Sequence, residues 1–215
     1  MPIRFDDLED ALEEELGREF WPRYSPTQPS PADRPVDSTA LLAALEAVER
    51  RPDPEPETAV RTLEADPHLE RDPHALVAIG VAYMQLYEDD LARPRLLKAL
   101  DLTKHREARI CVNLSTIALN WGDLNEAREW ARKAIKASPR YPGGHIQLLC
   151  ADCQDRDDDV ISADLDALER AIPGWRCDPL IMERARNDPL LARLRADPGI
   201  RRKVFRHNPW MEEGE

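Results

Sequence analysis

The sequence predicts an all-α protein, a solenoid of about three helix pairs that ends in a helical cap. Apolar residues recur at spacings of three and four, which places them on one side of a helix. Small residues recur 35 positions apart, which indicates a repeated unit. Eleven of the 19 prolines lie in residues 1–73, whereas only Pro94 falls between residues 74 and 138. Long helices are therefore predicted for the middle of the chain.

Composition and charge limit the classes of protein to consider. The 215 residues are 42% hydrophobic and 33% charged, with a net charge of −12, which is typical of a soluble globular protein. The most continuous apolar stretch, residues 75–84, is far shorter than the roughly 20 residues that span a bilayer. The acidic first residues lack the basic start of a signal peptide. We therefore expect a cytoplasmic protein without a membrane segment.

Residues 1–36 are expected to form an acidic amphipathic helix followed by a proline-rich linker. The apolar stripe of this helix consists of Phe5, Leu8, Leu12, Leu16 and Phe20. The linker occupies residues 25–38, a stretch rich in proline and serine. Two roles remain open for the stripe: it fills a binding groove elsewhere in the chain, or it is itself bound by another protein.

A short helical pair is expected within residues 37–72. Its helices are predicted at residues 38–50 and 55–65, separated by Pro52, Pro54 and Pro56. Ser38 is a suitable residue for the start of the first helix.

Residues 73–174 hold the repeat. Gly80 and Ser115, Ala92 and Ala127, and Ala99 and Ala134 are each 35 positions apart. A third, weaker copy follows, in which Asp152 replaces the aromatic residue of the first copy and the register of the second helix shifts. Small residues at these positions let paired helices approach each other closely. Gly122 and Pro139 mark turns between helices.

Residues 175–215 are expected to form a helical cap and tail. The segment 188–205 has the pattern of short helices that cover the exposed apolar end of a repeat array. Residues 176–207 carry nine Lys or Arg and four acids, so this end is basic on an otherwise acidic chain. Such charge orients a protein partner or docks the cap on the acidic repeats, and nucleic-acid binding is not expected because aromatic residues do not interleave with the basic ones.

The spacing of Leu76, Gly80 and Tyr83, repeated at Cys111, Ser115 and Ala118, resembles the tetratricopeptide repeat family. The resemblance implies a groove lined by the first helix of each pair, which holds a protein or peptide segment, either a helix or an extended chain. It assigns these groove residues: His74, Val77, Val81, Met84 and Gln85; Arg109, Val112, Asn113, Thr116, Leu119 and Asn120; Gly143, Ile146, Cys150, Cys153 and Gln154.

The predicted function is that of a non-enzymatic adaptor or a chaperone-like subunit. The carboxylate-binding subclass of the family is not expected, because Asn113 alone stands at one of its ligand positions whereas Val77, Val81 and Gly143 replace others. Two alternatives stay open: a metal-dependent regulator or enzyme built on cysteine and histidine, and a scaffold subunit that assembles with its own copies.

The metal alternative depends on Cys150 and Cys153, which have the spacing of half a zinc site. Cys111, Cys177 or His145 would have to complete it, and we expect four reduced thiols and no metal instead. The aspartates of residues 155–159 lack the glycine and the closing glutamate of a calcium loop. No catalytic residue and no cofactor are predicted, because glycine-rich phosphate loops and the common hydrolase motifs are missing.

Trp121 and Trp130 are expected in the core or between repeats, and the tail residues Trp21 and Trp210 are candidates for an interface.

Overall fold

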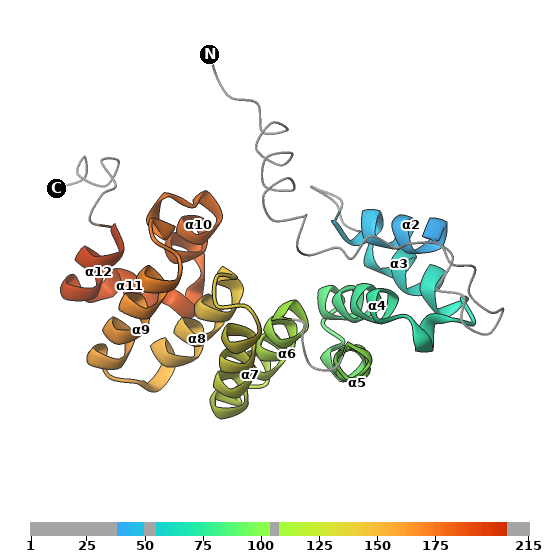
Figure 1. The fold of residues 1–215 in the computed structure, drawn as a ribbon, viewed down its shortest axis with the longest axis horizontal. Helices are drawn as coiled ribbons and strands as arrows, with labels where there is room; N and C mark the ends of the chain where they lie inside the picture. The colour runs from blue at the N-terminus through green and yellow to red at the C-terminus, as the bar shows by residue number, and fades with distance from the viewer. Residues whose placement is uncertain (1–37, 50–54, 104–107, 206–215) are drawn as a thin grey trace, which may run out of the picture. The chain divides into compact units, whose positions relative to one another are not determined.

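The computed structural model describes residues 38–49, 55–103 and 108–205, which belong to one compact unit, Pro35–Glu215. The predicted N-terminal helix and its linker, together with Trp21 and Trp210, lie outside the described residues. Within the described ranges every regular element is a helix, which confirms the all-α prediction (Figure 1).

The helices pack as successive antiparallel pairs, and each pair also packs against the next. Figure 1 follows this order from α2 to α9. The four pairs are α2 (Ser38–Glu49) with α3 (Pro56–Glu64), α4 (Pro73–Gln85) with α5 (Asp89–Leu102), α6 (Ala108–Asn120) with α7 (Leu124–Ala137), and α8 (Pro142–Asp155) with α9 (Asp158–Ala171). A single-turn 3₁₀ helix, η1 (Leu69–Arg71), precedes α4.

Helix starts reproduce the repeat frame. The first helices α4 and α6 begin at residues 73 and 108, and the second helices α5 and α7 begin at residues 89 and 124, so both spacings are 35 residues. The next spacing is 34 residues, because α8 begins at residue 142 and α9 at residue 158. The third copy is thus one residue shorter but keeps the geometry of a helix pair.

Small residues set the distance between paired helices. Gly80 on α4 and Ala92 on α5 are buried, and a methyl group added at Gly80 would lie 2.8 Å from Cγ of Leu96. In the next pair the Ser115 hydroxyl donates a 2.8 Å hydrogen bond to the carbonyl oxygen of Ala127, so the hydroxyl is satisfied although it is fully buried.

The third copy uses large residues at the positions where the first two use small ones. Leu149 and Ile161 stand where the second copy has Ser115 and Ala127, and both are buried. The second helix of this copy is anchored by Ile161, Leu165 and Leu168. Ala163 on the same helix is exposed.

Aspartate followed by proline starts several helices. The Asp72 carboxylate accepts hydrogen bonds from the backbone N–H groups of His74 and Ala75 at the start of α4. Asp178 does the same for α10 (Pro179–Asn187). A carboxylate satisfies the unpaired N–H groups of a first turn, and proline fits that turn because it has no N–H to satisfy.

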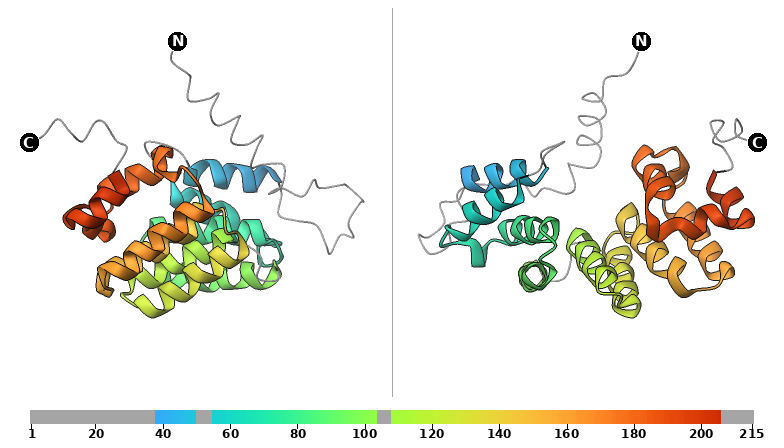
Figure 2. Two further views of the ribbon diagram at one scale, coloured as in Figure 1. Left: turned by 60° about the vertical axis from the view of Figure 1, so that its left-hand side comes forward. Right: turned by 180° about the vertical axis from the view of Figure 1, so that it is seen from behind.

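The C-terminal helices pack on α8 and α9 (Figure 2). The cap consists of η2 (Trp175–Cys177), α10, η3 (Pro189–Leu191), α11 (Ala192–Ala196) and α12 (Pro198–Phe205). Its buried residues, among them Leu191, Ile200 and Val204, share one apolar cluster with Leu165 and Leu168 of α9. The end of the array is therefore closed by the cap, as burial of apolar surface requires.

Candidate partner-binding surface

Partly buried and mostly apolar side chains line one side of α4 and of α6, which pack against each other as neighbouring first helices. We call this set the first-helix surface: Val77, Val81, Met84, Val112 and Thr116. The spacings of three and four residues place each helix's members on one face. All but Thr116 pack against the first core cluster with part of the side chain and leave the rest to solvent. Packing on the core therefore holds these side chains in place.

A positively charged side chain lies at the edge of this surface. Arg109 at the start of α6 is exposed and forms no ion pair within the described part of the chain. Burial raises the pKa of Tyr141, and the nearby guanidinium groups of Arg109 and Arg184 oppose that rise. Tyr141 packs on α6 because Gly143 leaves room for its ring: a methyl group at Gly143 would lie 2.8 Å from the ring. His74 and Asn113 lie at other margins, exposed and half-exposed.

The three predicted groove amides are all engaged within the chain. Gln85 donates to the carbonyl oxygen of Val48 at 3.0 Å, which ties α4 to α2. Asn120 donates to the Asp89 carboxylate at 2.9 Å, which ties α6 to α5. Gln154 donates to the carbonyl oxygen of Leu190 at 2.8 Å, which ties α8 to the cap. These amides join neighbouring elements of the fold.

Three of the five predicted groove residues of the third copy are closed to a ligand. Ile146, Cys150 and Cys153 are buried, in the same apolar cluster as the cap residues. Cys150 lies 3.9 Å from Arg184 and 4.0 Å from Asp188, both in the cap. Leu119 on α6 is also buried in this cluster. The sequence pattern assigned these side chains to the groove but could not show that the cap packs on top of them.

A buried ion-pair network joins α7, α8 and α9. Arg128 on α7 is almost fully buried; its Nε donates to the Asp152 carboxylate at 2.5 Å and its Nη2 to the Ala151 carbonyl oxygen at 3.0 Å. It also pairs with Asp155. The Asp164 carboxyl group lies against that of Asp152; burial and this neighbour raise the pKa of Asp164 to about 7. In the sequence, Asp152 is notable only because it replaces the aromatic residue of the first copy. Its pairing with Arg128 was not predicted.

The cysteines differ from reactive thiols in their surroundings. Burial raises the pKa of Cys150 and of Cys153 to about 12, so in the metal-free chain both are protonated thiols near neutral pH. The His145 ring is bonded through Nε2 to the carbonyl oxygen of Pro139 at 2.9 Å. Over the ranges that the structure describes, no three histidine, cysteine or acidic side chains are close enough to hold a metal ion.

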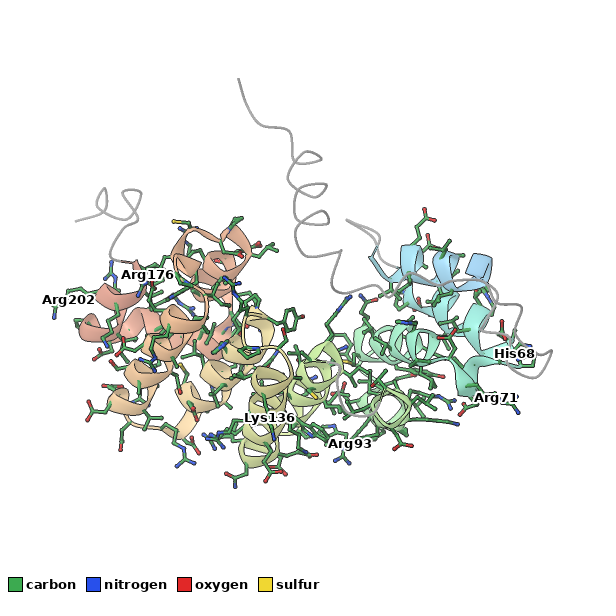
Figure 3. The ribbon with its side chains drawn as sticks, viewed as in Figure 1. His68, Arg71, Arg93, Lys136, Arg176 and Arg202 are labelled. Carbon is green, nitrogen blue, oxygen red and sulfur yellow. The ribbon has the colours of Figure 1, made fainter. Side chains whose placement is uncertain are left out.

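The two tryptophans of the second copy differ in their surroundings. Trp130 is half-buried against the core, and its indole N–H donates to Glu126. Trp121 is 45% exposed and is not a core residue. Of the two predicted places it has the one between repeats, because Arg93 of α5 lies 5.3 Å above its ring. Figure 3 labels Arg93, which also pairs with Glu126 on α7.

A family model for the tetratricopeptide repeat matches residues 108–141, which comprise α6, α7 and the turn that leads into α8. The chain contains a tetratricopeptide repeat at these residues. The matched repeat lies next to the first copy at α4 and α5, whose helices have the same lengths as α6 and α7, 13 and 14 residues. Tetratricopeptide repeats bind other proteins, which makes a protein partner the general expectation for this chain. No curated protein matches the sequence.

In the described part of the chain, none of the helices combines the length and apolar character needed to cross a bilayer.

Proposed function

We propose that this protein is a non-enzymatic adaptor or chaperone-like subunit of the cytoplasm that holds a segment of a partner protein on its first-helix surface. One observation carries the proposal: two neighbouring first helices, α4 and α6, present half-exposed apolar side chains at helical spacing, centred on Val81 and Val112. Such a face suits a helix or extended segment with apolar anchors.

The proposed site is smaller than the full set of predicted groove residues. It extends over α4 and α6 and stops at α8, because the cap buries Ile146 and Cys150. Two turns of a partner helix with two or three apolar anchors would cover such an area. Arg109 at its margin, without an ion-pair partner in the described ranges, favours a partner that carries an acidic residue beside its anchors.

The basic cap is better explained by contacts within the chain than by nucleic acid. Lys203 pairs with Asp166 of α9, Arg176 with Glu169, and Arg193 with Asp158. Figure 3 labels Arg176 and Arg202 in this region. These pairs support docking of the cap on an acidic helix, one of the two roles that the charge pattern left open.

The test is capture of partners from native cell extract by the full-length protein and by a variant that combines Val81→Glu with Val112→Glu. Both side chains are only partly buried, so helicity by circular dichroism should stay unchanged while partner capture is lost. Leu119 is unsuitable for this test because it is buried.

The matched control places glutamate at two exposed leucines elsewhere, Leu42 and Leu180. The control should capture the partner as well as the unmodified protein does. Partner capture that survives Val81→Glu with Val112→Glu in a folded protein would rule out the first-helix surface.

A further inference from the structure

One turn of the cap lies on a first helix of the array, in the position expected for a bound segment. The turn η3 packs on α8, where the side chain of Leu191 is buried in one apolar cluster with Cys150 and Cys153. The Gln154 amide donates a hydrogen bond to the backbone carbonyl oxygen of Leu190 at 2.8 Å. The third copy thus holds this turn by a buried leucine and a bonded backbone carbonyl group.

The shape of η3 is stabilised by residues close to it in sequence. The Asp188 carboxylate accepts a hydrogen bond from the backbone N–H of Leu190 at 2.9 Å and pairs with Arg184 at 2.7 Å. Pro189 fits the first position of the turn because it has no N–H to satisfy. Aspartate and proline favour such a turn by local contacts, so an aspartate, a proline and two leucines in this order favour the same turn in another chain.

The second copy has a matching amide on α6, 34 residues earlier in the chain. Asn120 corresponds to Gln154, and Thr116 corresponds to Cys150. Gln154 bonds one carbonyl group of its own helix and one of the cap. Asn120 is exposed and also has two N–H groups; one donates to Asp89, and the other has no partner in the described part of the chain. A donor for a ligand carbonyl group is therefore present on α6.

The apolar residues of the site also have counterparts one copy earlier. Val112 on α6 corresponds to Ile146 on α8, and Met84 on α4 corresponds to Leu119 on α6. Ile146 and Leu119 are buried in the cluster that contains the cap, whereas Val112 and Met84 are only partly buried. Apolar side chains that the cap covers in the third copy are thus left accessible in the copies before it.

We infer that the first-helix surface binds a partner segment of the same kind as η3, an aspartate followed by a proline and two leucines. This inference rests on the proposed function and names its ligand. The second leucine of the segment packs on Met84, Val112 and Thr116, as Leu191 packs in the third copy. The backbone carbonyl group of the first leucine accepts the second N–H group of Asn120. The partner thus repeats the contact that the cap makes one copy further along the array.

The test is a titration of the isotope-labelled full-length protein with a short synthetic peptide, followed by nuclear magnetic resonance. The peptide carries aspartate, proline and two leucines at its centre, with glycine and serine on both sides, so that it has no positive side chains to attract the acidic protein. We expect backbone amide signals of α4 and α6 to shift and to saturate as the peptide concentration rises. Replacing the second leucine of the peptide with serine should weaken binding about tenfold or more, because the buried apolar contact is lost.

Variants of the protein locate the peptide. Asn120→Ala should weaken binding about threefold or more through loss of one hydrogen bond. Gln85→Ala, the same position one copy earlier, is the matched control and should leave peptide binding unchanged. Because Asn120 also ties α6 to α5, the variant with Val81→Glu and Val112→Glu provides a second measurement, and it should abolish binding.

The outcomes distinguish failure of this inference from failure of the proposed function. If the peptide does not bind while Val81→Glu with Val112→Glu still abolishes partner capture from cell extract, the inference is overturned and the proposed function stands. Signal shifts confined to α8 and the cap would overturn it as well, because the peptide would then displace η3 rather than bind beside it. A concentration-dependent mass in light scattering that the same double variant abolishes would overturn it in favour of a second copy of this chain as the occupant.

Discussion

At the scale of single residues, Asp152 has surroundings unlike those of the equivalent residues in the first two copies. In the first two copies the equivalent residues are Tyr83 and Ala118, both buried among apolar neighbours. Asp152 is equally buried but ion-paired with Arg128, and it has the Asp164 carboxyl group beside it. Two adjacent carboxyl groups are most stable when they share a proton, because two buried like charges repel each other. The Oδ2 atom of Asp164 is buried without a hydrogen-bond partner in the described ranges, which strengthens this preference.

This arrangement predicts how stability depends on pH. The pKa of Asp164 is about 7 in the folded protein, against an ordinary 3.8, so the folded state binds the proton more tightly than the unfolded state does. The contribution of Asp164 to the free energy of unfolding is therefore present in full below about pH 4, falls as the pH rises to about 7, and is constant above that. Asparagine cannot ionise, so Asp164→Asn should make the decline in the free energy of unfolding smaller by about 1 to 2 kcal/mol. This figure is reduced for solvent screening because Asp164 is only half-buried.

Chemical denaturation at several pH values between 5 and 8 checks this prediction. The matched control is Asp101→Asn, an exposed aspartate on α5, which should leave the pH dependence as it is. If the free energies of unfolding of Asp164→Asn and of the unmodified protein decline in parallel with pH, the shared proton between α8 and α9 does not exist.

At the scale of helices, the contact between α4 and α5 is decided by Gly80. Glycine inside an exposed helix costs about 1 kcal/mol relative to alanine, so helix propensity alone predicts that Gly80→Ala stabilises the protein. Packing predicts the reverse, because the new methyl group would lie 2.8 Å from Cγ of the fully buried Leu96. We expect Gly80→Ala to lower the free energy of unfolding by about 1 to 3 kcal/mol, as overpacking does.

The sign of this change, measured by urea denaturation, separates the two effects. A stabilised Gly80→Ala variant would mean that α4 and α5 are not in the close register of a tetratricopeptide pair.

The sequence predicted the helices well, for reasons that particular residues make clear. Packing between neighbouring helices requires small residues at regular intervals, as at Gly80, Ser115, Ala92 and Ala127. A fixed interval in the sequence therefore predicts the helix pairs directly. The site was harder to predict, because exposure depends on what packs from a distance in the chain. Nothing near Cys150 in sequence shows that residues 184–191 cover it, and nothing near Arg128 shows that Asp152 neutralises it.

At the scale of the whole molecule, the cap completes the array. Ile161, Leu165 and Leu168 of α9 are buried in one cluster with Trp175, Leu191 and Val204 of the cap. Because small residues are absent from these positions of α9, this pair depends more on large apolar contacts than the first two pairs do.

Truncation after residue 174 should therefore lower the helical content by more than the cap helices themselves contribute. We expect circular dichroism to show additional loss from α8 and α9, and hydrogen exchange to show that α4 to α7 remain protected. Truncation after residue 205 keeps the cap helices and is the control. If α8 and α9 stay fully protected without the cap, the cap has no structural role and its purpose must be sought in binding.

The claim that a partner lies on the first-helix surface is tested most directly by photo-crosslinking in living cells. A photoreactive amino acid is placed at Val81 or Val112 on the first helices and, for comparison, at Glu129 on the exposed side of α7. The account predicts that Val81 and Val112 crosslink to the same partner protein and that Glu129 does not. A partner that crosslinks through Glu129 but through neither valine would contradict the account.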